Sequence, residues 1–172
     1  MDSKNPMQEV CIEKVTLNMG VGSSGEPLQN AKILLERLSG RKAISTKART
    51  RNPTFKIKRG DEIGAKVTLR GKEAYDFLKK AFIARGNKLS SRSIDGFGNF
   101  SFGIPEYIEF PGAKYDPKIG ILGFEVAVTM KRRGGVRIAR RKRCRAKLPK
   151  RQHPSPQETT NFLRQSFGVS IE

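Results

Sequence analysis

Ile63-Gly64-Ala65-Lys66-Val67-Thr68-Leu69-Arg70 is the stretch of sequence that decides the fold. Its odd-numbered residues are apolar and its even-numbered residues are glycine, polar or charged, and this period of two predicts a strand with one buried side. A helical pattern follows at 72–85 and stops before Gly86. The apolar stripe of that helix consists of Ala74, Phe77, Leu78, Ala81 and Phe82. A two-layer α+β sandwich buries the apolar side of such a strand against the apolar side of such a helix.

The same two patterns recur along the chain. Alternation predicts further strands within 9–19, at 100–104 and at 121–131, and a short strand at 43–47. Apolar stripes predict helices at 27–39 and 156–167, and the second of these opens with the capping box Ser155-Pro156-Gln157-Glu158. The sequence at 136–144 is compatible with a short basic helix. The length of 172 residues favours one domain with a tail, which we divide into an α+β body at 1–131 and a basic arm with a C-terminal helix at 132–172.

The positive charge is concentrated in two segments. The chain has 35 Lys and Arg against 16 Asp and Glu, a net charge of +19. Residues 41–59 contain eight bases and residues 131–151 contain twelve, and neither segment has an acid. Like charges at this density predict a polyanionic partner, and they favour nucleic acid. An anionic membrane is the weaker alternative, because Val136, Ile138 and Leu148 alone offer bulky apolar contacts in the second segment.

Several classes of protein are disfavoured by the sequence. No apolar stretch approaches the ~20 residues of a membrane span, and charges at Asp2, Lys4 and Glu9 argue against a signal peptide. Cys11 and Cys144 are far apart and lack metal-ligand spacing, so we expect two free thiols in an intracellular protein. We expect no bound metal.

A glycine-rich turn raises the possibility of an enzyme. Gly20-Val21-Gly22-Ser23-Ser24-Gly25 fits the dinucleotide-binding pattern between a strand and a helix, which would suit a nucleotide-dependent oxidoreductase. That site needs an acid about 20 residues later, and 41–59 contains none. A tight turn is therefore the favoured interpretation. The single histidine, His153, has no nearby acid, and Asp61-Glu62 suit capping better than metal binding. We expect no enzymatic activity and no cofactor.

The polar sides of the two clearest strands form a candidate binding surface. If helices cover the apolar sides, the opposite surface presents Lys14, Thr16, Asn18, Lys66, Thr68 and Arg70. Short hydrogen-bonding side chains among cations suit RNA backbone and 2′-hydroxyl groups, although an ordinary solvated sheet surface has the same pattern. In the first basic segment, Phe55 could stack on a base or pack into the core. A free nucleic-acid chaperone or DNA-binding protein is a further alternative.

Specific motifs resemble the large-subunit ribosomal proteins that bind 5S rRNA, number five in bacterial naming and number eleven in eukaryotic naming. The match runs in order over about 6–131, and 131–172 is similar to the archaeal and eukaryotic branch. The motifs are Val15-Thr16-Leu17-Asn18-Met19-Gly20-Val21-Gly22, Leu38-Ser39-Gly40-Arg41-Lys42-Ala43, Lys47-Ala48-Arg49, Phe55-Lys56-Ile57-Lys58-Arg59-Gly60, Ile63 to Gly71, Asp95 to Gly103 and Tyr115-Asp116-Pro117.

The resemblance implies a fold, a location and three contact regions. It implies an antiparallel sheet with helices on one side, in the central protuberance of the large subunit of a cytoplasmic ribosome. Asn18 and Thr68 match positions that bind 5S rRNA, and Arg41 stands where bacterial members often have Gln. With residues added from the strand alternation, the expected 5S rRNA contacts are Lys14, Thr16, Asn18, Arg41, Lys66, Thr68 and Arg70.

The resemblance also assigns the two basic segments. The loop at 47–60 is expected to approach peptidyl-site tRNA, with Lys47, Arg49, Arg51, Asn52 and Phe55. The arm is expected to anchor in large-subunit rRNA through Arg132, Arg133, Arg137, Arg140, Arg141, Arg143 and Arg145. Other ribosomal proteins are expected partners, including a small-subunit protein in an intersubunit bridge, which we do not assign to residues.

Overall fold

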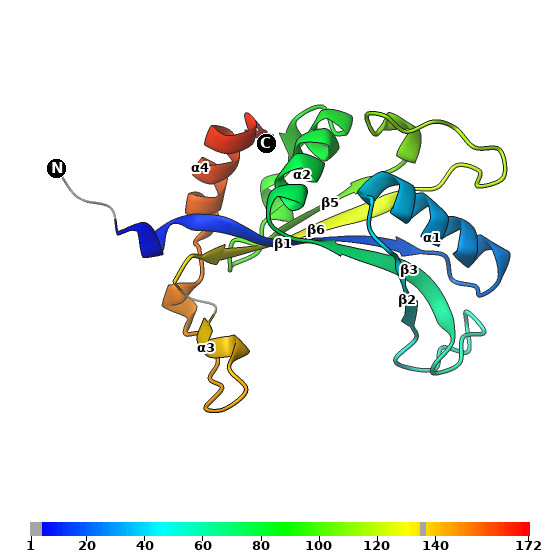
Figure 1. The fold of residues 1–172 in the computed structure, drawn as a ribbon, viewed down its shortest axis with the longest axis horizontal. Helices are drawn as coiled ribbons and strands as arrows, with labels where there is room; N and C mark the ends of the chain where they lie inside the picture. The colour runs from blue at the N-terminus through cyan, green and yellow to red at the C-terminus, as the bar shows by residue number, and fades with distance from the viewer. Residues whose placement is uncertain (1–4, 135–136) are drawn as a thin grey trace.

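The computed structural model describes residues 5–134 and 137–172, which form an antiparallel sheet covered by helices on one side (Figure 1). The five strands lie in the order β2-β3-β1-β6-β5, and every neighbouring pair is antiparallel. Their bounds are β1 (Val10–Gly20), β2 (Ile44–Lys47), β3 (Glu62–Leu69), β5 (Phe100–Ile104) and β6 (Phe124–Arg132). The strands predicted from alternation are confirmed.

Three helices pack on the same side of the sheet. They are α1 (Glu26–Ser39), α2 (Lys72–Ala84) and α4 (Pro156–Phe167), and the predicted two-layer α+β sandwich is therefore confirmed. A small parallel pair, β4 (Lys88–Leu89) and β7 (Ser170–Ile171), holds the end of the chain. The remaining short elements are α3 (Arg137–Arg140) and the 3-10 turns at Pro6–Gln8, Ser91–Ser93, Tyr107–Glu109 and Lys150–Gln152. In the described part of the chain, no helix is long and apolar enough to cross a membrane.

One hydrophobic core joins the sheet to all three helices. Leu17 of β1, Leu35 of α1 and Leu78 of α2 are fully buried in it. Leu163 of α4 and Val169 belong to the same core, so the C-terminal helix packs with the body although it follows the basic arm in sequence. The predicted division at 131 falls inside β6, one residue before its end.

The glycine-rich turn between β1 and α1 is a structural connection. The amide groups of Val21 and Gly22 both donate to the carbonyl oxygen of Ile63 at 2.9 Å. Gly22 and Gly25 adopt φ angles of +77° and +106°, which favour glycine. Two of its amide groups are hydrogen-bonded to β3, and because the sheet is antiparallel the turn does not belong to the parallel βαβ unit of a dinucleotide site.

Candidate nucleic-acid interface

The strand register brings the predicted polar residues together on the sheet surface that faces away from α1, α2 and α4, which we call the open face. Thr16 lies opposite Thr68 on one side and Ala127 on the other, and Asn18 lies between Lys66 and Glu125. A register shift between Ile12 and Lys14 places Lys14 opposite Thr129. The shift lets Ile12 stay buried while Lys14, Thr16 and Asn18 alternate onto the open face.

The open face extends beyond the residues predicted from β1 and β3. The same alternation in β6 and β5 adds Glu125, Ala127, Thr129 and Ser101, and β2 adds the exposed Ile44. These residues were missed because the prediction considered the polar sides of only two strands. Asn18 Nδ2 donates to Glu125 Oε2 at 3.3 Å, so this acid is directly beside a predicted RNA contact.

An open hollow of about 560 Å³ lies at one end of the open face. Gly20, Gly103 and Gly123 line it together with Asn18 and Glu125. Gly20 and Gly103 lie in strands, and a Cβ atom at either would meet nothing within 4 Å, so a ligand can approach the peptide groups closely there. Asn18 is thus at the border between a flat polar surface and a hollow.

Arg70 and Arg41 have intramolecular partners. Arg70 lies 3.7 Å from the carboxylate of Glu13, and the Arg70 side chain is exposed while that of Glu13 is half-buried. Arg41 lies in the connection from α1 to β2, where its Nε donates to Glu73 Oε2 at 2.9 Å and its Nη2 binds the other carboxylate oxygen. This contact lowers the pKa of Glu73 and raises that of Arg41, chiefly through the side-chain hydrogen bonds. The structure therefore places Arg41 against helix α2 and outside the strand residues of the open face.

The basic loop at 47–60 is an ordered hairpin end. Asn52 and Ile57 exchange backbone hydrogen bonds of 2.9 and 3.0 Å, and the Asn52 side chain accepts from the amide of Thr54. Phe55 is 70 % exposed at the tip, so the alternative that it packs into the core is wrong. Lys47, Arg49 and Arg51 are also exposed. Asp61 closes the base of the hairpin by accepting from the amide of Lys58 at 2.7 Å, which gives this acid a structural role.

The basic arm contains both exposed and engaged arginines. Arg141, Arg143 and Arg145 are exposed. Arg133 pairs with Glu9 at 3.2 Å, and Arg132 is half-buried in contact with Glu158. Arg132 therefore binds within the protein, although it was predicted to contact rRNA. The side chains of Arg137 and Arg140 lie outside what the structure describes.

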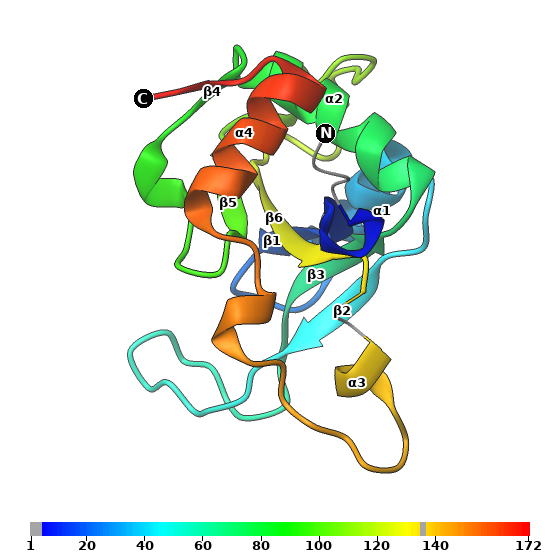
Figure 2. The ribbon, with the colours of Figure 1, turned by 90° about the vertical axis from the view of Figure 1, so that its left-hand side faces the viewer.

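The basic loop and the arm project from the same side of the sheet. Figure 1 shows both on the side opposite the helices, at opposite ends of the sheet, and Figure 2 shows both below the sheet. Near the arm, Leu148, Gln152 and His153 border a small cavity with Thr129 of the open face. The open face is thus flanked by the two acid-free segments, which is suited to a polyanion that spans it.

The remaining reactive side chains offer little chemistry. Burial raises the pKa of the Cys11 thiol, while Lys131 and Arg133 oppose that shift. The ring of His153 lies 4.9 Å from that of Phe97. Among the described residues, no group of three or more His, Cys, Asp or Glu side chains could hold a metal ion.

Comparison with known proteins identifies the family. Residues 5–58 match the family model for ribosomal protein L5, and residues 62–153 match the model for the C-terminus of the same ribosomal family. Proteins named large ribosomal subunit protein uL5 are similar over nearly the whole chain. The one from Sulfurisphaera tokodaii is 48% identical over 97% of this chain and 94% of the relative. Those from Methanococcus aeolicus and Thermoplasma acidophilum are 45% and 44% identical, over 98% and 97% of this chain and 94% and 98% of the relatives.

Two family models and relatives of this identity cover most of the chain, and the relatives are archaeal. The chain therefore belongs to the ribosomal L5 family in its archaeal form, and it is a structural constituent of the large subunit of the cytoplasmic ribosome rather than an enzyme.

Proposed function

We propose that the open face binds 5S rRNA, with the basic loop and the arm holding neighbouring RNA on either side. One observation carries this proposal: a row of hydroxyl and amide side chains lies in register on β1 and β3, between two acid-free segments that project from the same side of the sheet. The predicted contacts on this surface are those of Lys14, Thr16, Asn18, Lys66, Thr68 and Arg70.

The chemistry of the open face favours shape-dependent recognition of RNA. Thr16, Thr68 and Asn18 can donate and accept hydrogen bonds, as 2′-hydroxyl groups require. Lys66 and Arg70, which lie beside these hydroxyl and amide side chains, can bind phosphate. Glu125 adds a negative charge next to Asn18, which disfavours a phosphate at that point and favours a donor group of a base or ribose.

The two basic segments are proposed to bind different RNAs. In the loop, exposed Phe55 lies at the tip of a hairpin closed by Asn52 and Ile57, where an aromatic ring can stack on RNA. We propose that this loop approaches peptidyl-site tRNA and that the arm binds large-subunit rRNA. Arg41 uses Nε and Nη2 to bind Glu73, so it offers chiefly Nη1 to a phosphate while that pair is intact. A contribution to an intersubunit bridge is also proposed, without assignment to residues.

A double substitution tests the assignment of the open face. Asn18→Ala with Thr68→Ala removes two short side chains from the open face, and we expect loss of 5S rRNA capture with an unchanged circular-dichroism spectrum. The matched control is Gln29→Ala with Gln165→Ala, which truncates two exposed side chains of the helix layer. If the control loses capture and the open-face variant keeps it, the wrong side of the sheet has been assigned.

A second variant separates the loop from the open face. Arg49→Ala, Arg51→Ala and Phe55→Ala together leave the hydrogen bonds between Asn52 and Ile57 in place. We expect normal 5S rRNA capture and weaker retention of tRNA by ribosomes that carry this variant. Loss of 5S rRNA capture would instead make the loop part of the 5S site. Equal capture of duplex DNA and 5S rRNA by the unmodified protein would favour a general nucleic-acid chaperone.

A further inference from the structure

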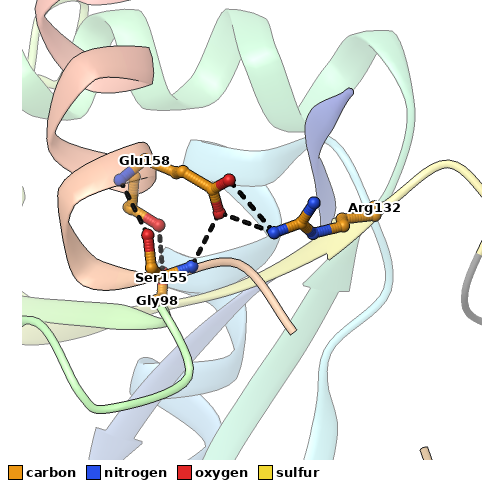
Figure 3. Close-up of polar contacts among 5 residues, drawn as sticks. Gly98, Arg132, Ser155 and Glu158 are labelled. Atoms are coloured by element: carbon orange, nitrogen blue, oxygen red, sulfur yellow. Dashed lines mark hydrogen bonds and ion pairs between the residues drawn. The ribbon is translucent and has the colours of Figure 1, made fainter. Parts of the chain in front are cut away.

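The two ends of the basic arm are joined by an ion pair (Figure 3). Arg132, the last residue of β6, donates from Nη2 to both carboxylate oxygens of Glu158, at 3.0 and 2.9 Å. Glu158 lies in the first turn of α4. The intervening residues 133–157 contain ten bases and no acid, and Glu158 is the one acid in residues 126–171. We call this contact between Arg132 and Glu158 the clip.

The carboxylate in the clip is held in place from its own helix. Glu158 Oε2 also accepts from the amide of Ser155 at 2.9 Å, and the Ser155 hydroxyl accepts from the amide of Glu158 at 3.3 Å. This reciprocal capping box fixes the orientation of the carboxylate toward Arg132 (Figure 3). Arg132 is only 20 % exposed, so its charge is better shielded from water than that of a surface pair.

The start of α4 is in turn attached to the body. Thr159 is fully buried, and its hydroxyl donates to the carbonyl oxygen of Gly98 at 3.0 Å. A Cβ atom at Gly98 would lie 2.5 Å from that hydroxyl and 3.0 Å from the carbonyl oxygen of Pro154, so the two segments are in close contact. Asn99, next in the chain, accepts from the amide of Met130 in β6 at 3.0 Å. The far end of the arm is therefore fixed to the strand that precedes it.

The near end of the arm is attached as well. The amides of Arg133 and Gly134 donate to the carbonyl oxygens of Glu9 and Met7, at 3.2 and 3.1 Å. The Arg133 guanidinium pairs with the Glu9 carboxylate. The near end of the arm is thus held to the segment that leads into β1 and the far end is held to the body, so the arm is a closed loop instead of a free tail.

We propose that Glu158 is a positioning residue: by binding Arg132 it adds to the contacts that hold the two ends of the arm together, so that the arm presents its cations to rRNA phosphates as one unit. This inference rests on the proposed RNA-binding role of the arm. A loop with joined ends has lost part of its conformational entropy before binding, so less is lost when RNA orders it. Arg132 also neutralises Glu158, which would otherwise repel RNA close to the arm.

The charge-matched pair Glu158→Gln and Glu172→Gln tests the clip. Glu172 forms an exposed ion pair with Lys88 at 2.8 Å, away from the arm. Each substitution raises the net charge by one, which by itself strengthens binding to RNA. We expect Glu172→Gln to bind a labelled RNA duplex of about two helical turns as tightly as the unmodified protein or more tightly. Glu158→Gln is expected to bind it about three- to tenfold more weakly, because the base of the arm is then held by fewer contacts and loses more conformational freedom on binding.

Two further measurements make the test specific. In the free protein, trypsin should cleave within 141–151 faster in Glu158→Gln than in Glu172→Gln, since an arm with a less restrained base exposes its backbone more often. When 137–147 is replaced by a Gly-Ser linker of equal length, the two variants should bind RNA equally. If the linker alone leaves RNA affinity unchanged, the proposed role of the arm fails and the clip proposal fails with it.

The remaining outcomes are also decisive. If the linker weakens binding but Glu158→Gln binds as tightly as Glu172→Gln, the arm binds RNA without help from the clip, and the proposal is overturned. Thermal unfolding reports whether Glu158→Gln is folded at the assay temperature. If it is not, Arg132→Lys replaces it, because a lysine keeps the charge but lacks the planar guanidinium. That variant is expected to weaken RNA binding, and unchanged binding would again overturn the proposal.

Discussion

Gly64 in β3 offers a sharp test of how the open face is built. A Cβ atom at this position would lie 2.5 Å from the carbonyl oxygen of Met19 and 2.9 Å from the Thr46 hydroxyl. An ordinary contact needs at least 3.4 Å, so the neighbouring backbone of the central strand must move by about 0.9 Å. Overpacking of this kind costs about 1–3 kcal/mol, and the advantage of Ala over Gly in a strand offsets about 0.5–1 kcal/mol. With both terms near the middle of their ranges, we expect Gly64→Ala to lower the free energy of unfolding by about 1 kcal/mol, and by at most about 2.5 kcal/mol.

Urea denaturation followed by circular dichroism measures this effect against Gly103→Ala. Gly103 lies in β5 of the same sheet, and a Cβ atom there would meet nothing within 4 Å. The control should therefore be neutral or slightly stabilising. Gly64 pairs with Gly20, close to the register pair of Asn18 and Lys66, so Gly64→Ala should also weaken 5S rRNA capture. Equal unfolding midpoints for the two variants would refute the steric argument, because both make the same chemical change.

Three further predictions concern the core, an ion pair and the salt dependence of binding. Leu163→Ala should lower the free energy of unfolding by about 2–5 kcal/mol in urea titrations, because Leu163 is fully buried, whereas a peripheral α4 would leave it unchanged. In carbon-detected NMR titrations, Glu73 should titrate below the usual pKa of a glutamate, and Arg41→Ala should raise the pKa of Glu73. The ion pair is present at neutral pH and is lost as the pH falls through the pKa of folded Glu73. Arg141→Ala, Arg143→Ala and Arg145→Ala together should reduce the slope of log affinity against log salt for duplex RNA by about 2–3, whereas Lys72→Ala, Lys79→Ala and Lys80→Ala in the helix layer should not change it.

The elements of this fold were predictable because their patterns are local. Alternation in 63–70 and the apolar stripe in 72–85 each require one buried side, whatever the rest of the chain does. The capping box at Ser155 and the left-handed Gly168 likewise set the ends of α4 within a few residues of sequence. The open face followed from the same reasoning for β1 and β3, and would have followed for β5 and β6 had their polar sides been considered.

The pairing of charged side chains was not predictable from these patterns. Arg41 and Glu73 are 32 residues apart, and Arg132 and Glu158 are 26 apart, so only the packing of helices on the sheet brings each pair together. Counting bases in acid-free segments therefore overestimates the cations that are free to bind RNA. It also misses that the arm returns to the body, since a run of bases looks the same in a free tail and in a closed loop.

The distribution of charge suggests how recognition can be both fast and selective. The two basic segments provide long-range attraction that acts on any polyanion and weakens with salt. On the open face between them, Glu125 lies beside Asn18 and Glu13 lies beside Arg70, so the attraction of this surface for phosphate as such is limited. If the open face binds 5S rRNA as proposed, binding there depends on whether hydroxyl and amide groups find partners at matching positions. Under that proposal, Glu125 increases discrimination because an RNA that offers only a phosphate beside Asn18 is repelled, whereas Glu13 weakens the attraction of Arg70 for phosphate.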